Sequence, residues 1–389
     1  MRRWLIKACK FKYQEPGALF PGSFLKRIGK GLAMKVYKIV AINLGSTSTK
    51  IAYYENDRCV LKENLSHQSS DLKGFATVWE QYDYRMDAIG GFLNAHGIRV
   101  EELDAFVTRG GHTKPLSGGV YRVNESMLEQ SRSERYGNHP TDLGLQIAWG
   151  FARYGPVPLT VDPPTTDEFE PLARYSGLAE MPRRSSFQVL NHRAVGKQFA
   201  KDQGKDYRAL NLIVAHMGGG ITVAAHKKGR LVDANNGIAG DGPFSTNRTG
   251  TLPVGALVDA CYSGAFTYQQ MMRKINGEGG LMAYLGDADA YRAEQEAAKG
   301  SQKHREALEA MCYQTSKEIA ACAAVLCGEV DAIIITGGMA HSLMMMDWIR
   351  RRVEFIAPVA LYPGEYEMQS LALSAYDALR GMERIKELV

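Results

Sequence analysis

The sequence has no long uninterrupted run of apolar residues, and no stretch approaches the roughly 20 residues that a membrane-spanning helix needs. The N-terminal stretch also lacks the continuous apolar segment of a secretory signal. No two cysteines form a CxxC pair, and no Cys/His spacing suggests zinc; the six are Cys9, Cys59, Cys261, Cys312, Cys322 and Cys327. We therefore expect a cytoplasmic protein with reduced cysteines and no membrane partner.

Basic charge is concentrated at one end of the chain. Residues 1–33 contain eight Lys and Arg but one acid, Glu15, which leaves 39 basic and 41 acidic residues in the remainder. This remainder lacks the basic footprint of a nucleic-acid-binding protein, so we expect no nucleic-acid partner. Met34 directly precedes a clean strand pattern. We expect residues 1–33 to be a disordered extension, or an artefact of the chosen start codon.

Two segments of the chain share one pattern. Residues 40–60 and residues 213–232, which lie 173 residues further on, each contain an apolar strand, a Gly-rich turn, a second strand, a polar turn and a third strand. This offset is too long for a solenoid repeat. The match indicates two domains with the same opening hairpins; the alternative is a chance similarity of two β-hairpins.

Strand and helix patterns alternate elsewhere, which indicates an α/β protein with mixed sheets. Further strands are expected at 105–108, 158–161, 331–336 and 356–361, and helices at 78–93, 140–152 and 302–326. The last helix has a stripe of residues spaced by three and four, which we expect to be buried: Leu308, Met311, Thr315, Ile319, Cys322 and Leu326.

Three Gly-rich turns each follow an apolar strand: 45–50, 216–220 and 336–338. Glycine permits tight turns and lets backbone N–H groups approach an anion closely. The first turn lacks the GxxxxGK[ST] spacing of a Walker P-loop. An ordinary flexible hairpin is the alternative for each turn taken alone. Together the three predict a site for nucleotide phosphates, with a nucleoside near the third turn.

Four charged residues follow strand ends or lie in polar loops: Arg109, Asp162, Arg248 and Glu365. The planar guanidinium of arginine matches phosphate and carboxylate oxygens. Two acids near phosphates could hold Mg²⁺ through water. The alternative for each residue is an ordinary surface charge, a cap or a turn residue.

These motifs in combination resemble the acetate and butyrate kinase family, most closely its butyrate kinases, over residues 34–389. The segments that carry the resemblance are 41–50, 108–119, 161–177, 216–236, 240–259, 335–342 and 362–368. The resemblance implies the fold of actin and sugar kinases: two duplicated actin-like (ribonuclease H-like) α/β domains with mixed sheets and a cleft between them. We expect one domain at 34–163 plus 368–389, and the other at 164–367 with a helical block at 261–327.

The resemblance also implies a reaction: ATP and a short-chain carboxylate, here butanoate, reversibly give ADP and an acyl phosphate, with Mg²⁺. It further implies a homodimer or larger homo-oligomer. A kinase for propionate, isobutyrate or another branched acid is one alternative. A nucleotide-hydrolysing switch or a catalytically weak ATP-binding homologue is another.

Individual roles follow from the same resemblance. The turn that contains Gly45 faces the transferring phosphate with Asn43, Ser46, Ser48 and Lys50. The nucleotide is bound by His216, Gly218, Gly219 and Gly220 at its phosphates, and by Gly337 and Gly338 at its adenosine. Mg²⁺ and its waters are organised by Asp162 and Glu365. The moving phosphoryl is steadied by Arg248, and the acid is bound by Arg109.

Gln188 departs from the family pattern, because relatives place a His after the Phe at this position. That His is thought to stabilise the transition state. Gln can still donate a hydrogen bond but carries no positive charge, which bears on turnover and on the preferred substrate.

The protonation state of a carboxyl group also bears on which class of compound accepts the phosphoryl group. A free carboxyl has a pKa of about 4.3, so it is already ionised at neutral pH and needs no general base. It needs cations that bring two anions together. Sugar kinases of this fold typically have Asp where this chain has Asn43, and that difference favours an acid as the acceptor.

Overall fold

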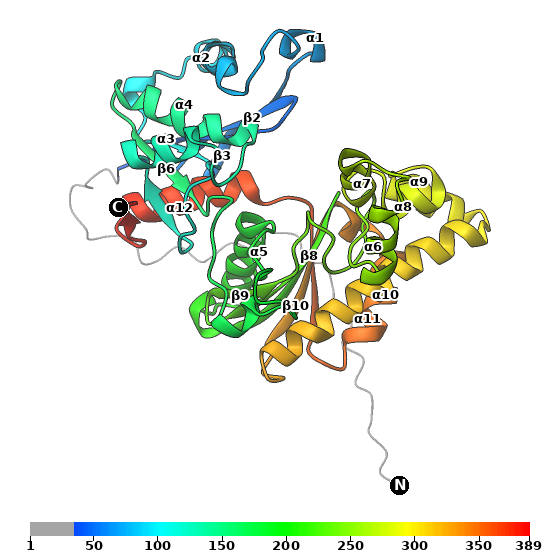
Figure 1. Cartoon of the computed structure of the whole chain (residues 1–389). Helices are drawn as coiled ribbons and strands as arrows, with labels where there is room; N and C mark the ends of the chain where they lie inside the picture. The colour runs from blue at the N-terminus through cyan, green and yellow to red at the C-terminus, as the bar shows by residue number, and fades with distance from the viewer. Residues whose placement is uncertain (1–34) are drawn as a thin grey trace, which may run out of the picture. The chain divides into compact units, whose positions relative to one another are not determined.

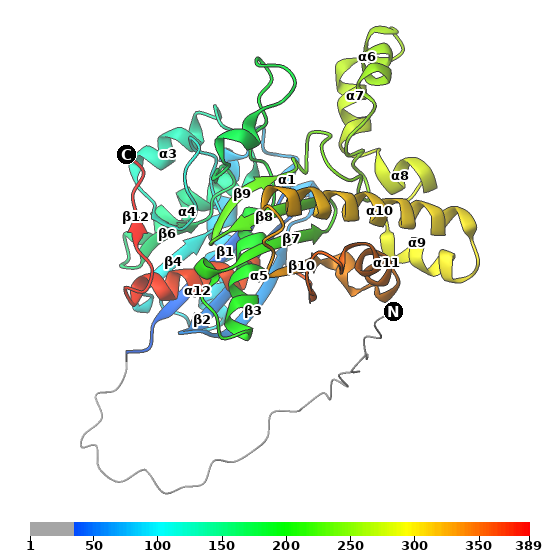
Figure 2. The same cartoon turned by 90° about the horizontal axis from the view of Figure 1, so that it is seen from below.

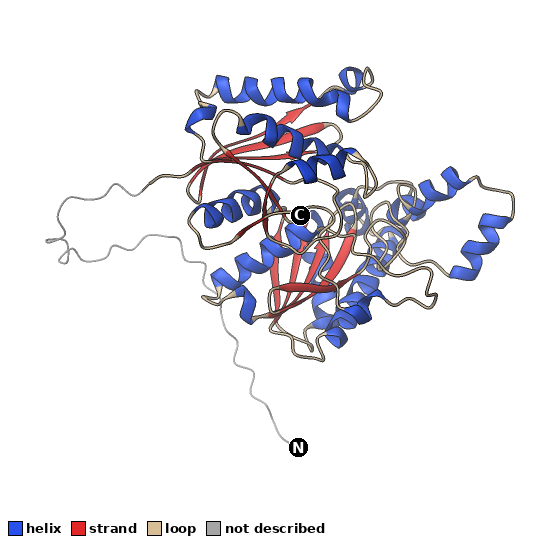
Figure 3. Ribbon diagram, turned by 60° about the vertical axis from the view of Figure 1, so that its left-hand side comes forward, coloured by secondary structure: helices blue, strands red, loops and turns tan. Residues whose placement is uncertain are grey.

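The computed structural model describes residues 35–389, and the prediction for residues 1–33 lies outside them. Residues Tyr37–Val389 form one compact unit, in which helices cover two β-sheets (Figures 1 and 3). The strands are β1 Lys38–Leu44, β2 Ser48–Glu55, β3 Arg58–Ser66, β4 Ala105–Thr108, β5 Val120–Arg122, β6 Val157–Val161, β7 Asn211–Met217, β8 Ile221–Lys227, β9 Arg230–Ala234, β10 Ala332–Gly337, β11 Val359–Pro363 and β12 Ile385–Lys386.

The helices alternate with these strands. The α-helices are α1 Ser69–Leu72, α2 Tyr82–Ala95, α3 Glu125–Arg132, α4 Leu143–Ala152, α5 Val189–Asp202, α6 Val254–Tyr262, α7 Tyr268–Ile275, α8 Gly280–Leu285, α9 Ala290–Ala298, α10 Gln302–Val325, α11 Leu343–Val353 and α12 Glu367–Leu379. Short 3₁₀ helices are Trp79–Gln81, Val100–Glu102, Pro140–Asp142, Pro171–Arg174, Tyr207–Ala209 and Gly338–His341.

The two sheets repeat one topology. The first has the order β12-β5-β6-β4-β1-β2-β3 and the second the order β11-β10-β7-β8-β9. In both, three antiparallel strands (β1–β3 or β7–β9) are followed by two strands parallel to the first of them (β4 and β6, or β10 and β11). The offset of 173 residues aligns β1 with β7 end to end. The predicted duplication is therefore confirmed.

Each sheet has two buried faces, because its central strands alternate their side chains between two cores. In β1, Val40 and Ile42 lie in the core below α2 and α4, whereas Ile39 and Ala41 lie in the core with α12. In the second sheet, α10 and α11 cover one face and α5 the other. Helices α5 and α12 also contact each other. The predicted domain boundaries remain a prediction.

The helical block expected at 261–327 begins earlier in the structure, because α6 begins at Val254, and it ends with α10 at Val325. All six residues of the predicted stripe at 302–326 are buried, so that prediction is confirmed. The strand expected at 356–361 was wrong in its bounds: β11 is Val359–Pro363. Pro358 explains the later start, because proline cannot donate a ladder hydrogen bond and pairing begins at Val359.

Within residues 35–389, no helix is both long and apolar enough to cross a bilayer. The five cysteines in this part of the chain are free thiols.

Candidate active site

The predicted site residues lie at the carboxyl ends of parallel strands. In the first sheet β1, β4 and β6 are parallel, and Asn43, Arg109 and Asp162 lie at or just beyond their ends. In the second sheet β7, β10 and β11 are parallel, and their ends lead into the glycine turns and into Glu365. Ligands of α/β proteins bind at such edges.

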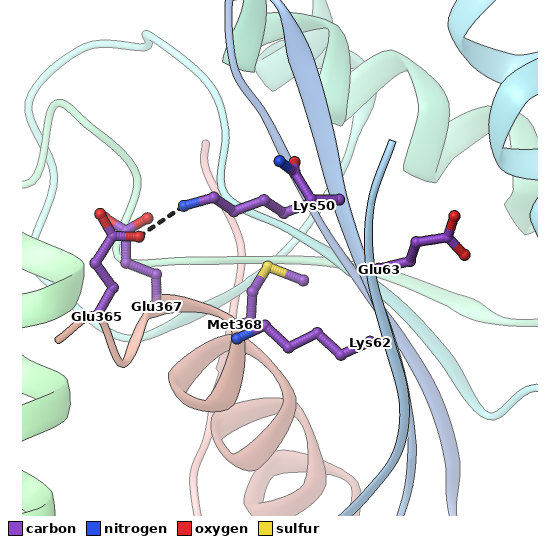
Figure 4. Close-up of a pocket in the computed structure, with 7 residues that line it drawn as sticks. Lys50, Lys62, Glu63, Glu365, Glu367 and Met368 are labelled. Atoms are coloured by element: carbon purple, nitrogen blue, oxygen red, sulfur yellow. Dashed lines mark hydrogen bonds and ion pairs between the residues drawn. The ribbon is translucent and has the colours of Figure 1, made fainter. Parts of the chain in front are cut away.

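Three polar contacts join these two edges. Asn43 donates from Nδ2 to Oε2 of Glu367 at 2.7 Å, and Arg109 Nη1 lies 3.1 Å from Glu367 Oε1. Lys50 Nζ donates to Oε2 of Glu365 at 2.6 Å, as Figure 4 shows. Burial would raise the pKa of Glu365, but the hydrogen bond and charge of Lys50 outweigh it and lower that pKa. Two predicted residues, Asn43 and Arg109, thus share an unpredicted acid, Glu367, and two others, Lys50 and Glu365, pair with each other.

A pocket of about 290 Å³ opens beside these contacts. It is lined by Lys50, Lys62, Glu63, Asn64, Glu365, Glu367 and Met368 (Figure 4). Strands β2 and β3 contribute one wall, and the start of α12 with the residues before it contributes the other. The mixture of ammonium and carboxylate groups suits a charged ligand better than an apolar one.

The turn between β1 and β2 is held from behind by Arg85 of α2. This fully buried guanidinium donates to three carbonyl oxygens, those of Gly45 (3.0 Å), Ser46 (3.2 Å) and Ser48 (3.0 Å). Ser46 is exposed and Ser48 is half-buried. With these carbonyls bound inward, the turn can present hydroxyl groups and N–H groups to an anion.

The second and third glycine turns lie side by side. Gly337 has a φ of +92°, and a Cβ there would lie 2.4 Å from the carbonyl oxygen of Met217, so glycine is required. A Cβ on Gly218 would lie 2.9 Å from Nε2 of His216. Gly219 and Gly338 have open space where a side chain would be. This space lets a ligand approach the backbone.

Arg248 lies beside the second glycine turn, and both Arg248 and Gln188 lie near Gly237. A Cβ on Gly220 would clash with Arg248 Nη1, which donates to the carbonyl oxygen of Gly237. Oε1 of Gln188 is 3.9 Å from the position of a Gly237 Cβ. Arg248 has no acidic partner within residues 35–389, and burial lowers its pKa. A half-buried arginine without a carboxylate is suited to an incoming anion.

Asp162 has other partners. Its Oδ1 accepts from the N–H of Gly119 at 2.8 Å and lies 3.1 Å from Nε of the buried Arg193. Burial raises the pKa of Asp162 although Arg193 opposes this shift. Its Oδ2 is buried without a partner. No interaction within residues 35–389 joins Asp162 to Glu365, so the predicted pair of metal ligands is not assembled by direct contact.

The donor chemistry of these acids nevertheless fits magnesium. Mg²⁺ prefers carboxylate oxygens and keeps several waters, so it seldom needs an all-protein cage. Within residues 35–389, no three His, Cys, Asp or Glu side chains lie close enough to hold a metal ion. Glu365 and Glu367 line the pocket and offer carboxylate oxygens for water ligands of a phosphate-bound ion, whereas the unpartnered Oδ2 of Asp162 is buried.

Three residues that organise this site were not predicted: Glu367, Arg85 and Asn191, whose Nδ2 lies 2.8 Å from Nδ1 of His216. Glu367 has a weak signal, because it lies two residues after the predicted Glu365. Arg85 and Asn191 lie inside α2 and α5, where nothing in the local sequence distinguishes them from other polar helix residues. Only their contacts reveal them.

Comparisons with known proteins identify relatives of this chain. Residues 178–356 match the model of the Acetokinase family. The chain is 44% identical over 352 residues to butyrate kinase 2 of Clostridium acetobutylicum, an alignment that covers 90% of this chain and 99% of that protein.

Solved structures show the fold. The acetate kinase of Porphyromonas gingivalis superposes with a TM-score of 0.71 at 18% identity, over 89% of this chain and 100% of that chain. A propionate kinase from Francisella tularensis superposes with a TM-score of 0.66 at 17% identity, over 87% and 98%. The expected actin-like fold is confirmed. The length and identity of the match to the Clostridium enzyme go further: the chain belongs to the acetokinase family.

Proposed function

We propose that this enzyme is a butyrate kinase, which catalyses butanoate + ATP = butanoyl phosphate + ADP. The 44% identity to butyrate kinase 2, over nearly the whole of both chains, supports this substrate pair. The observation in the structure that supports it best is the set of contacts from Asn43, Lys50 and Arg109 to the acids after β11. These contacts join the carboxyl-end edges of the two sheets. These groups suit the transfer of a phosphoryl group to an anion.

In the proposed mechanism the edge of each sheet binds a different part of the substrates. Residues 218–220 and 337–338 bind the phosphates and the adenosine, and the open space beside Gly219 and Gly338 lets a ligand approach the backbone there. Asn43, Ser46, Ser48 and Lys50 bind the oxygens of the transferring phosphoryl. Arg248 and Gln188 donate to the same group from the opposite edge. These donors fix the phosphoryl for attack and stabilise its charge.

Arg109 is proposed to bind the carboxylate of the acid. Its guanidinium already contacts a carboxylate, that of Glu367, in the absence of any ligand. A substrate carboxylate offers the same two oxygens in the same planar geometry. One ionised oxygen then attacks the γ-phosphorus as the bond to ADP breaks, so no proton has to be removed by the enzyme.

The proposed mechanism also includes Mg²⁺, which offsets the negative charge of the ATP phosphates. Asp162, Glu365 and Glu367 would hold it through water next to the ATP phosphates. When bound, Mg²⁺ neutralises phosphate oxygens and so lets an anionic acid approach.

A hydroxamate assay for acyl phosphate over a panel of short acids tests the function. The expected result is product with ATP, Mg²⁺ and butanoate. Product only with propionate, isobutyrate or another branched acid would move the assignment to a different carboxylate kinase. Binding of ATP without any acyl phosphate would contradict the proposal and favour a catalytically weak homologue or a switch.

We also propose that the chain acts as a homo-oligomer through α6. None of the nine residues of this helix is buried, although it carries an apolar face of Val254 (72% exposed), Val258 (48%) and Tyr262 (88%). Figure 2 shows α6 and α7 projecting beyond α8 and α10. A second copy of the chain is the proposed cover, since the family resemblance implies homodimers or larger assemblies.

A further inference from the structure

His216 presents a ring nitrogen to the glycine turn that is proposed to bind phosphates. The side chain is buried at the end of β7, and a Cβ on Gly218 would lie 2.9 Å from its Nε2. No other group within residues 35–389 bonds this nitrogen. Whether Nε2 carries a proton therefore decides whether the turn has one more donor for an anion, or a lone pair that repels it.

The partner of the other ring nitrogen decides this question. Nδ1 of His216 lies 2.8 Å from Nδ2 of Asn191, which is fully buried in α5. An amide nitrogen can only donate, whereas an amide oxygen can only accept. The orientation of the Asn191 amide thus determines which form of the imidazole is compatible.

That orientation is fixed by the backbone. The N–H of Tyr366 donates to Oδ1 of Asn191 at 2.9 Å, and a backbone N–H cannot be matched with an amide NH₂ group. The second hydrogen of Nδ2 is directed to Oγ1 of Thr336 at 3.5 Å, and this hydroxyl in turn donates to the carbonyl oxygen of Gly364. Every polar atom of Asn191 has a matching partner in this orientation and in no other.

We propose that Asn191 is a positioning residue, which holds neutral His216 with its proton on Nε2 as a hydrogen-bond donor to the phosphates of the nucleotide. Nδ1 must accept from Asn191, so the single proton of the neutral ring resides on Nε2. The role toward ATP rests on the proposed function, but the protonation state follows from the contacts alone.

The charged neighbours are compatible with a neutral ring. Burial lowers the pKa of His216 below its ordinary value, while Glu367 and Glu365 oppose this shift and Arg109 adds to it. His192 of α5, with ring centroids 6.4 Å apart, is buried and has a still lower pKa. Near neutral pH the ring therefore provides one N–H without a charge.

The wild-type protein gives the first test. Selective ¹⁵N labelling of histidine, with His216→Gln used to assign the signal among nine histidines, reports which ring nitrogen is protonated. We expect a protonated Nε2 and an unprotonated Nδ1, with or without bound ADP. A proton on Nδ1 in the wild type would overturn the inference.

Asn191→Asp gives the second test, because it keeps the acceptor for Tyr366 and replaces the donor to His216 by an acceptor. Neutral His216 must then carry its proton on Nδ1, and only the imidazolium regains the Nε2–H. We expect kcat/KM for ATP to fall on the order of 10- to 100-fold at high pH and to recover as the pH is lowered. The wild type should lack this step.

A matched control is Asn94→Asp, which adds the same charge at an exposed position of α2. It should behave like the wild type. An Asn191→Asp enzyme with wild-type kcat/KM at high pH would refute the role of Asn191. If the wild type has the expected protonation but forms no acyl phosphate with any acid, the proposed function fails while the assignment of the proton stands.

Discussion

The side-chain oxygen of Gln188 accepts a hydrogen bond from a buried threonine. The hydroxyl of Thr222 donates to Oε1 of Gln188 at 2.6 Å, and Nε2 of His192 lies 2.8 Å from the same hydroxyl. Because the hydroxyl uses its one hydrogen on Gln188, it accepts from His192. No hydrogen bond within residues 35–389 uses the amide NH₂ group of Gln188, so this group is left to donate to a ligand.

Thr222→Val should therefore impair turnover more than nucleotide binding. Valine has nearly the same shape but no hydroxyl, so the amide of Gln188 is free to rotate. We expect kcat to fall roughly 5- to 20-fold, a loss of about one or two hydrogen bonds, with a nearly unchanged KM for ATP. Steady-state kinetics of acyl phosphate formation measure this.

Thr222→Ser keeps the hydroxyl and is the control, which should recover most of the activity. Equal kcat values for the valine variant and the wild type would show that the orientation of Gln188 does not depend on Thr222.

Glu318 of α10 should make stability depend on pH. Burial, with Asp241 and Asp233 nearby, raises the pKa of Glu318 to about 7, while Arg183 opposes the shift. A carboxyl whose pKa is raised in the folded state stabilises the fold below its unfolded pKa, and this contribution is lost as the pH rises through about 7.

The side chain at position 318 cannot titrate in Glu318→Gln. The free energy of unfolding of this variant, relative to that of the wild type, should therefore increase between pH 5 and pH 8. The expected relative gain is about 3 kcal/mol at most. Urea unfolding at several pH values measures it, with the exposed Glu354→Gln of the α11 terminus as control. A constant difference across this range would contradict the raised pKa.

At the scale of elements, α2 and the β1–β2 turn form a single unit through Arg85. The guanidinium supplies both Nη atoms to the turn, and no acidic residue within 35–389 pairs with it. Lysine keeps the charge but lacks the planar fork that reaches several carbonyls at once.

Arg85→Lys should accordingly loosen the turn. Leaving buried carbonyls unpaired costs about 2–4 kcal/mol, so we expect a lower unfolding temperature and a raised KM for ATP. Thermal unfolding and kinetics measure both effects. Arg58→Lys at the exposed start of β3 is the matched control. An unchanged KM in a destabilised Arg85→Lys protein would show that the turn does not bind the nucleotide.

Elements with local signals were the predictable part of the fold. The stripe of α10 and the repeated hairpins follow from spacing alone, because their periodicity is set by neighbours in the sequence. The bounds of β11 were wrong, since pairing with β10 rather than apolar content decides where that strand begins. The acid Glu367 was missed for a similar reason: its partner Asn43 lies 324 residues away.

At the scale of the whole molecule, the exposed face of α6 makes the state of association testable. Val258→Asp places a charge in the middle of the apolar face and should shift the protein from a dimer or larger assembly toward a monomer. Light scattering coupled to size exclusion measures the mass. Gln295→Asp on α9, which is also exposed, should leave the mass unchanged. A monomeric wild type would refute the proposed contact.

The contact between Arg109 and Glu367 has a consequence for affinity. The carboxylate of Glu367 competes with the carboxylate of every incoming acid for the guanidinium of Arg109. Because Glu367 belongs to the same chain, its effective concentration is constant. Entry of the acid is then an exchange of one anionic partner for another, so the measured dissociation constant includes the work of displacing Glu367. We therefore expect a low affinity for the free acid, and we expect the acyl product to be released with similar ease.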